Sequence, residues 1–234
     1  MQSQENTSLF DQQNASSYDK QWIKTAAFKE ALHLSIRLVL SDLPSDAKIL
    51  CVGAGTGAEL VYLAREFPEW QFTIVEPAIP MLDICRKRAK ENGISSRCVF
   101  HWGYINELPE TNSHHAATCL LVSQFLINKD ERRDLFKNIS IRLRDGGYLI
   151  NADLASDMSS ADFESLFEVW VKMLKYCDIP DKQIEEYSAA YQNQVAVLPP
   201  SEIEAIIQSG GFEKPILFSQ TLLIHAWYSK KISN

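Results

Sequence analysis

Three glycines spaced two residues apart, and a carboxylate downstream of them, are the residues of this chain best suited to bind a ligand. The stretch KILCVGAGTGAEL, residues 48–60, carries Gly53, Gly55 and Gly57 between an apolar run and a helix-like pattern. Glycine permits a tight turn and a close approach to the backbone, and the free amides at a helix N-terminus attract an anionic group. Glu76 ends the next predicted strand, where an acid would accept hydrogen bonds from ribose hydroxyls. The spacing therefore predicts a nucleotide-like ligand.

Two classes of ligand fit these residues. Gly53, Gly55 and Ala58 satisfy the GxGxxA pattern of dinucleotide-binding folds, and S-adenosylmethionine presents the same ribose diol to the same acid. A dinucleotide-binding fold commonly opens the chain and continues into a second nucleotide-binding half. Here a polar stretch and a predicted helix precede the glycines, and a predicted hairpin ends the sequence. This arrangement favours S-adenosylmethionine, while an NAD(P)-dependent oxidoreductase stays open as an alternative.

The elements around the glycines alternate between strands and helices. An amphipathic helix is expected from Trp22 to about Leu43, and five strands follow it with helical patterns between them: KILCV, QFTIVE, SRCVFHW, AATCLLVSQFL and YLINADL. Such alternation requires crossover connections and a parallel sheet. The tail GGFEKPILFSQTLLIHAWYSKK predicts two more strands, joined as an antiparallel hairpin. We therefore expect a doubly wound α/β fold with a seven-stranded, mostly parallel sheet.

Four segments follow from this pattern. We expect an N-terminal cap segment and helix over residues 1–45, a Rossmann-like cofactor-binding core over 46–154, a helical lid inserted after the fifth strand over 155–209, and a hairpin that completes the sheet over 210–234. The lid segment holds ten acidic residues and three lysines, so its net charge is −7, the same as that of the whole chain. An acidic segment of this size repels phosphate backbones and disfavours extended nucleic-acid binding.

Composition places the chain among globular proteins. Of 234 residues, 46% are hydrophobic and 23% charged, which suits one domain with a substantial core. No apolar run reaches the roughly 18 residues of a membrane span, and the start has no basic end leading into an apolar run, so we expect no membrane span and a cytoplasmic location. The five cysteines are scattered singly and are expected as reduced thiols. The histidines lack metal-ligand spacing, so no metal site is expected.

Five stretches resemble, in the right order, the motifs of the class I, Rossmann-like S-adenosylmethionine-dependent methyltransferases. These stretches are ILCVGAGTGAEL for the first motif, FTIVEPAIPML for the acidic loop, HWGYINELP for the loop that covers the adenine, LLVSQFL for the fourth strand beside the methyl group, and IRLRDGGYLINADL for the fifth strand. The start, FDQQNASSYDKQW, resembles the small-molecule branch, whose N-terminal segment folds over the cofactor. The resemblance covers nearly the whole chain.

The resemblance implies transfer of a methyl group from S-adenosylmethionine to a small-molecule acceptor by in-line displacement, with S-adenosylhomocysteine as the product. It assigns to the cofactor Gly53, Ala54, Gly55, Gly57, Glu76, Pro77, Met81, Gly103, Tyr104, Ile105, Val122, Ser123 and Tyr18. Glu76 would hold the ribose and Met81 would lie near the adenine. Many relatives carry Asp after the glycine of the adenine loop, but Tyr104 follows Gly103 here, so the adenine contact would come from Tyr104 or from Asn106.

Methyl transfer from a sulfonium needs mainly an acceptor held in line with the methyl carbon and the exclusion of water, so no dedicated base is required. Asp153, at the end of the fifth predicted strand, is the candidate base or substrate contact, with a plain helix cap as the alternative. The expected acceptor site is walled by aromatic side chains, which the core of the lid would otherwise use: Trp22, Phe125, Trp170, Tyr187 and Tyr191. A homodimer is the one assembly that we leave open.

Other readings stay open as well. The VSQFL stretch and the lid are also similar to carboxy-S-adenosylmethionine synthase, an enzyme of tRNA modification, which uses arginine to hold the extra carboxylate of its ligand. This sequence has no arginine after Arg144, which argues against that activity. A non-catalytic cofactor-binding protein is the remaining alternative. The acidic lid favours neutral or cationic acceptors over polyanions.

Overall fold

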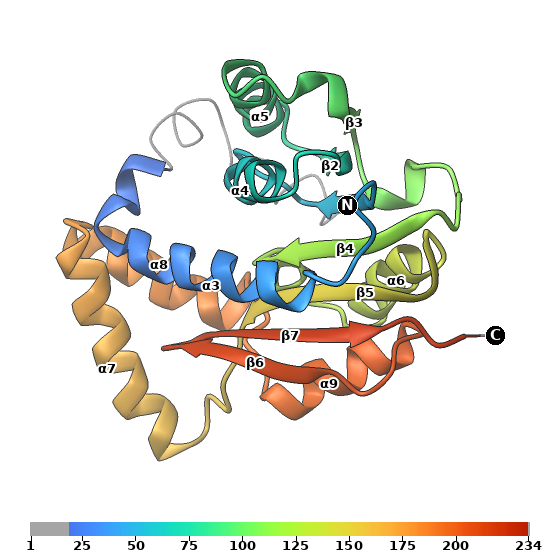
Figure 1. Cartoon of the computed structure of the whole chain (residues 1–234). Helices are drawn as coiled ribbons and strands as arrows, with labels where there is room; N and C mark the ends of the chain where they lie inside the picture. Colours follow the sequence, from blue (N-terminus) through green and yellow to red (C-terminus); the bar gives the residue numbers. More distant parts are fainter. Residues whose placement is uncertain (1–18, 234) are drawn as a thin grey trace.

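A seven-stranded sheet forms the centre of the computed structural model, which describes residues 19–233 (Figure 1). The strand order is β3-β2-β1-β4-β5-β7-β6, and only β7 runs antiparallel to its neighbours β5 and β6. The strands are β1 Lys48–Val52, β2 Gln71–Glu76, β3 Cys98–Trp102, β4 His114–Leu120, β5 Leu143–Leu154, β6 Ile216–Thr221 and β7 Ile224–Lys230. The predicted doubly wound sheet with its C-terminal hairpin is confirmed.

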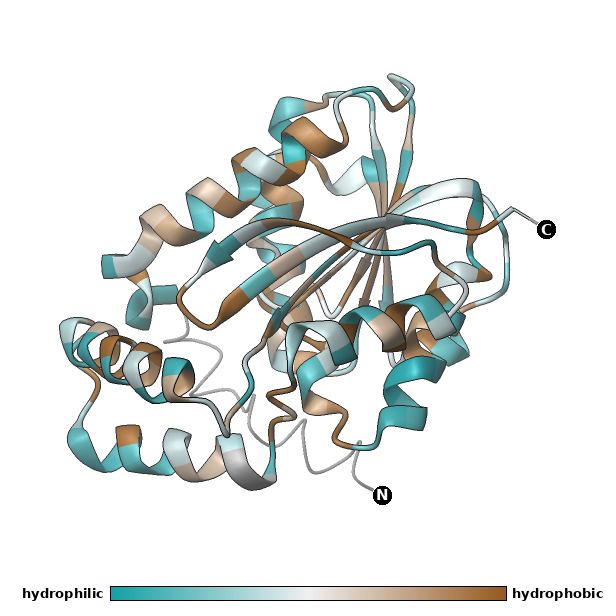
Figure 2. Ribbon diagram, turned by 90° about the horizontal axis from the view of Figure 1, so that it is seen from below, coloured by the Kyte–Doolittle hydropathy of each residue, from teal (hydrophilic) through white to brown (hydrophobic). Residues whose placement is uncertain are grey.

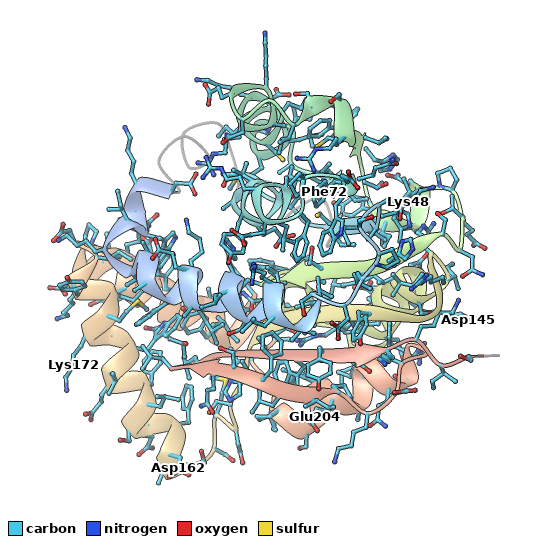
Figure 3. The ribbon with its side chains drawn as sticks, in the orientation of Figure 1. Lys48, Phe72, Asp145, Asp162, Lys172 and Glu204 are labelled. Atoms are coloured by element: carbon cyan, nitrogen blue, oxygen red, sulfur yellow. The ribbon has the colours of Figure 1, made fainter. Side chains whose placement is uncertain are left out.

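Helices cover both faces of the sheet. The α-helices are α3 Ala26–Val39, α4 Ala58–Glu66, α5 Ile79–Glu91, α6 Lys129–Ser140, α7 Ala161–Tyr176, α8 Asp181–Asn193 and α9 Pro200–Ser209. Helices α3, α4 and α5 share one apolar cluster with the sheet, and Phe72 of β2 lies inside it (Figure 3). Helices α6 and α9 share the cluster on the other face. The central strands are therefore buried on both sides, which explains their continuous apolar sequences.

The fourth strand ends earlier than its sequence predicts. AATCLLVSQFL reads as one apolar run, but β4 stops at Leu120 because Leu121 adopts a left-handed backbone with φ +58°. Residues Ser123–Phe125 then form the short 3-10 helix η4. A non-glycine residue in this conformation is uncommon and costs energy. The chain therefore turns away from the sheet at its carboxyl edge, where parallel α/β sheets bind ligands.

The helical segment after β5 divides into two parts. Helices α7 and α8, which we call the helical pair, lie at one end of the molecule and pack around Trp170, Leu174 and Ile184 (Figures 1 and 2). This apolar cluster also includes Leu154 of β5 and Leu223 of the β6–β7 turn. Helix α9 instead buries Ile203 and Ile207 in the main core against α6. The segment 155–209, in which we expect a lid, therefore holds both the helical pair and a helix that covers the sheet. Within residues 19–233, none of the helices has the length and apolar character that crossing a bilayer requires.

Candidate functional site

The glycine loop, residues 53–57, joins β1 to α4 at the carboxyl edge of the sheet. All three glycines have left-handed backbones, with φ of +64°, +53° and +78°. A Cβ atom on Gly53 would lie 2.5 Å from Cγ2 of Val122, and one on Gly57 would lie 2.6 Å from Sγ of Cys85. At Gly55, no atom of residues 19–233 beyond its two chain neighbours lies within 4 Å of that position. Two of the glycines thus serve protein packing, whereas Gly55 leaves room for a ligand to reach the backbone.

Glu76 ends β2 beside the open face of the glycine loop. Its Oε2 accepts a 2.9 Å hydrogen bond from the amide of Gly55, and its Oε1 accepts one of 2.9 Å from the amide of Ala78. The side chain is only 7% exposed. Burial raises the pKa of this carboxyl, and the two amide hydrogen bonds partly oppose that shift. Each oxygen keeps a second lone pair, so the carboxylate can accept two hydroxyl groups of a ligand without losing its backbone partners.

The loops after β2 and β3 lie beside each other, since the amide of Gly103 donates to the carbonyl of Glu76. Met81, at the start of α5, is buried with Ala78 in a small apolar cluster. Glu107 lies across this loop and accepts a 2.8 Å hydrogen bond from the amide of Tyr104. The sequence reasoning missed Glu107, although a glutamate three residues after the start of a helical turn is the signal of a capping box. Glu107 thus adds a carboxylate to the loop in which relatives carry Asp.

The loop after β4 contacts the glycine loop and then turns inward. Leu121 is held by a 2.7 Å hydrogen bond from its amide to the carbonyl of Ala152 on β5. Val122 packs against Gly53. Ser123 is fully buried and donates to Asp153. Val122 therefore borders the glycine loop, whereas the Ser123 hydroxyl points into the protein.

Asp153 does not have the surroundings of a base. Its carboxylate is wholly buried and lies 2.9 Å from Nη2 of Arg132, which is equally buried. It also accepts hydrogen bonds from the Ser123 hydroxyl at 2.8 Å, the Asn151 amide group at 2.6 Å and the Gln124 backbone at 3.0 Å. A carboxylate that is closed to solvent and paired with a cation has no free position for an acceptor proton. Where we expected a base or substrate contact, the structure shows a buried carboxylate that joins Arg132 of α6 to the loop after β4.

Arg132 is the partner that the sequence did not reveal. The run KDERRDLF reads as the charged outer face of a helix, yet the Arg132 side chain turns inward from α6. Its Nε donates to Ser123 at 2.8 Å, and its Nη1 donates to the carbonyl of Ala196 at 3.2 Å. Ala196 lies between α8 and α9, so this arginine joins the loop after β4 to the chain that leaves the helical pair.

Glu59 is a second buried carboxyl group that sequence reasoning did not single out. It lies in the first turn of α4, directly after the glycine loop, and accepts a hydrogen bond from the hydroxyl of Thr118 on β4. The thiol of Cys51 on β1 is a further partner. Burial raises the pKa of Glu59 to about 7, and these two hydrogen bonds oppose the shift. A group with this pKa changes its charge near neutral pH, beneath the loop that faces the ligand.

Most of the aromatic residues expected at the acceptor site come together. Trp22, Tyr187 and Tyr191 pack against the cluster that contains Trp170, and the Trp170 indole donates a 3.0 Å hydrogen bond to the Tyr191 hydroxyl. Phe125 lies apart from this cluster, in η4 at the end of β4. Tyr18 lies outside the described residues. The four clustered side chains fill the interior of the helical pair and its contact with the N-terminal segment.

Comparison with known proteins gives a match to one domain and a likeness in fold. Residues 49–147 match the model of a methyltransferase domain. The fold is similar to that of a possible exported protein from Bordetella parapertussis, with 15% identity, a TM-score of 0.68, and coverage of 88% of this chain and 68% of that one. It is also similar to the S-adenosylmethionine-dependent methyltransferase SibL, with 14% identity, a TM-score of 0.64, and coverage of 89% and 57%.

A third similar structure is an O-methyltransferase family 2 protein from Planctomyces limnophilus in complex with apigenin, with 14% identity, a TM-score of 0.62, and coverage of 95% and 62%. The chain thus spans less than two thirds of the length of these last two proteins. No curated protein matches the sequence. At such identities the structural likeness concerns the fold, and the methyltransferase domain rests on the match of residues 49–147.

Proposed function

We propose that this chain, which carries a methyltransferase domain with S-adenosylmethionine as its cofactor, methylates a small molecule that is neutral or cationic. One observation carries the proposal. The open face of Gly55 lies beside the buried Glu76 carboxylate, at the carboxyl edge of the sheet and within the matched domain. Gly55 offers a backbone without a side chain for the amino-acid part of the cofactor, and the two carboxylate oxygens of Glu76 can accept hydrogen bonds from its ribose.

The residues present fit this cofactor. Gly55 is free of steric contact, Glu76 keeps lone pairs for two hydroxyl groups, and Met81 provides an apolar neighbour for the adenine. Glu107 offers a carboxylate near the adenine amine. When bound, the cofactor supplies an activated methyl group. The protein then has to orient the acceptor and exclude water, and such positioning contributes about 7–11 kcal/mol to a reaction barrier.

The acceptor is proposed to bind between the sheet edge and the helical pair. The interior of that pair is apolar, with Trp170 buried among aliphatic side chains and Tyr187 and Tyr191 packed against it. Its outer surface carries charged side chains such as Asp162 and Lys172 (Figure 3). Its acidic excess disfavours anions. Arg132, the arginine beside the β4 loop, is occupied by Asp153 and is not free to hold a second carboxylate. This arrangement favours a plain methyl donor over a carboxylated one.

The test of this function combines binding and turnover. Purified protein is incubated with S-adenosylmethionine and a panel of neutral, cationic and anionic small acceptors, and the products are weighed by mass spectrometry. We expect one class of acceptor to gain 14 mass units, the mass of a CH₂ group. Turnover only with polyanions would reject the proposed specificity.

Binding is tested separately at Glu76. Each charge-assisted hydrogen bond contributes about 1.5–3 kcal/mol, so Glu76→Ala is expected to weaken S-adenosylhomocysteine binding at least tenfold in calorimetric titration. Glu76→Gln keeps the shape and removes the charge, and it should weaken binding to a smaller degree. Glu69→Gln, an exposed site, is the matched control. An unchanged dissociation constant in both Glu76 variants would remove this residue from the cofactor site.

A further inference from the structure

Residues 19–25, which we call the strap, contact both the glycine loop and the helical pair. The strap contains a helical turn at residues 19–21 and the 3-10 helix η1, Ile23–Thr25, and it leads directly into α3. In Figure 1 it is the dark blue segment between the α4–α5 side of the molecule and the ends of α7 and α8. The methyltransferase match begins only at residue 49, so the strap lies outside the matched domain.

The first end of the strap holds the glycine loop. Asp19 forms an ion pair with Arg88 of α5 and accepts a 3.3 Å hydrogen bond from the hydroxyl of Thr56. Arg88 donates in turn to the same hydroxyl at 3.1 Å. Thr56 is buried and lies between Gly55 and Gly57. The three side chains therefore close a ring that joins the strap, the loop and α5.

The second end of the strap holds the helical pair. The Gln21 side chain donates a 3.1 Å hydrogen bond to the Tyr187 hydroxyl on α8. Lys24 forms a 2.6 Å ion pair with Asp178, between α7 and α8. Trp22 packs against the apolar cluster of the pair. The contacts to the glycine loop and the contacts to the helical pair are made by residues within one short segment. The loop and the pair therefore cannot move apart unless the strap loses its contacts to one of them.

We propose that the strap couples binding of the cofactor at the glycine loop to the position of the helical pair. A ligand against Gly55 orders the loop and with it the Thr56 hydroxyl, which makes the ring with Asp19 and Arg88 more persistent. The strap then stays in place and holds α7 and α8 over the acceptor side of the sheet. Coupling between sites is reciprocal, so an acceptor held by the pair strengthens cofactor binding by the same factor. This inference rests on the proposed function, because it needs S-adenosylmethionine to bind at the glycine loop.

Hydrogen exchange with S-adenosylhomocysteine as the probe tests the coupling without any turnover. In the wild-type chain, saturating S-adenosylhomocysteine is expected to slow amide exchange in the glycine loop and also in α7 and α8. The expected slowing is about fivefold or more, because fivefold is the lower end of typical coupling between two sites. In Asp19→Asn the loop should keep its protection while α7 and α8 lose theirs. Tyr187→Phe, which removes one of the three contacts at the other end and keeps the ring, should give a smaller loss in α8.

The matched control is Glu66→Gln. It removes the ion pair between Arg37 of α3 and Glu66 of α4, whose side chains are 38% and 35% exposed, against 29% and 30% for Arg88 and Asp19. This variant should keep protection in both regions. Protection of the loop alone in the wild type, or protection of α7 and α8 that survives in both Asp19→Asn and Tyr187→Phe, would overturn the coupling. A wild-type loop without protection would instead reject the cofactor site, and with it the proposed function.

Discussion

Three buried carboxyl groups near the carboxyl edge of the sheet differ in what surrounds them. Glu76 is held by backbone amides and borders the open face of Gly55, so it remains able to accept ligand hydroxyls. Asp153 is neutralised by Arg132 in the interior. Within residues 19–233, Glu59 has a hydroxyl and a thiol as its partners and no cation, and burial raises its pKa to about 7. The same functional group thus serves binding, structure and titration according to its neighbours.

The Glu59 carboxyl should make stability depend on pH. Its pKa is raised from 4.5 to about 7 in the folded state, so folding favours the protonated form. The stabilisation that this proton provides is complete below about pH 4.5 and is lost as the pH rises to about 7, a change of about 3 kcal/mol. Urea unfolding at a series of pH values should show this fall in the wild type relative to Glu59→Gln, which cannot titrate. If the free energy of unfolding depends on pH in the same way in both proteins, Glu59 is ionised throughout.

Asp153 offers a prediction that separates structure from chemistry. Asp153→Ala leaves Arg132 buried without its counter-ion, and breaking such a pair costs about 3–5 kcal/mol. The free energy of unfolding in urea should fall by that amount, whereas Asp134→Asn on the exposed face of α6 should change it little. A variant of Asp153 that is fully stable but inactive would restore the role of base.

At the scale of elements, the glycine loop shows how one motif meets two demands. Gly55→Ala should cost about 1–2 kcal/mol of stability, because its left-handed backbone disfavours a side chain, and it should abolish S-adenosylhomocysteine binding by filling the open face. Gly53→Ala should cost about 1–3 kcal/mol more, because its methyl group overlaps Val122. Both variants are measured by thermal unfolding and by titration with S-adenosylhomocysteine. A double variant, Gly53→Ala with Val122→Ala, is measured in the same way. Failure of Val122→Ala to restore stability would refute the packing argument.

The whole molecule consists of a main core with a smaller cluster attached to it. Because α7 and α8 pack in a smaller cluster, which meets the sheet at the end of β5 and at the β6–β7 turn, they should open at a lower free energy than the central strands. Helix α9 is the internal control, since it follows the pair in sequence but packs in the main core. In native-state hydrogen exchange of the ligand-free protein, the amides of α9 should therefore exchange as slowly as those of β1, β4 and β5. The amides of α7 and α8 should exchange faster. Joint exchange of all three helices would support one lid of residues 155–209.

The sequence by itself determined the features that local patterns encode. Strands and helices follow from the periodicity of apolar residues within a few positions, and the glycine loop and Glu76 follow from motifs read at fixed spacing. Seven strands, their alternation with helices and the ligand edge of the sheet were predictable in this way. The end of β4 was not, because the left-handed backbone of Leu121 has no signal in an apolar run.

Tertiary structure alone decided which of the polar residues are free. Asp153 looked available at the end of its strand until Arg132, which lies on a different element, was found against it. The ring of Asp19, Thr56 and Arg88 joins residues up to 69 positions apart. The partner of a charged side chain depends on how distant elements pack, and no local pattern records that packing. The sequence therefore determined where a ligand can bind, and the packing of distant elements determined which side chains can reach it.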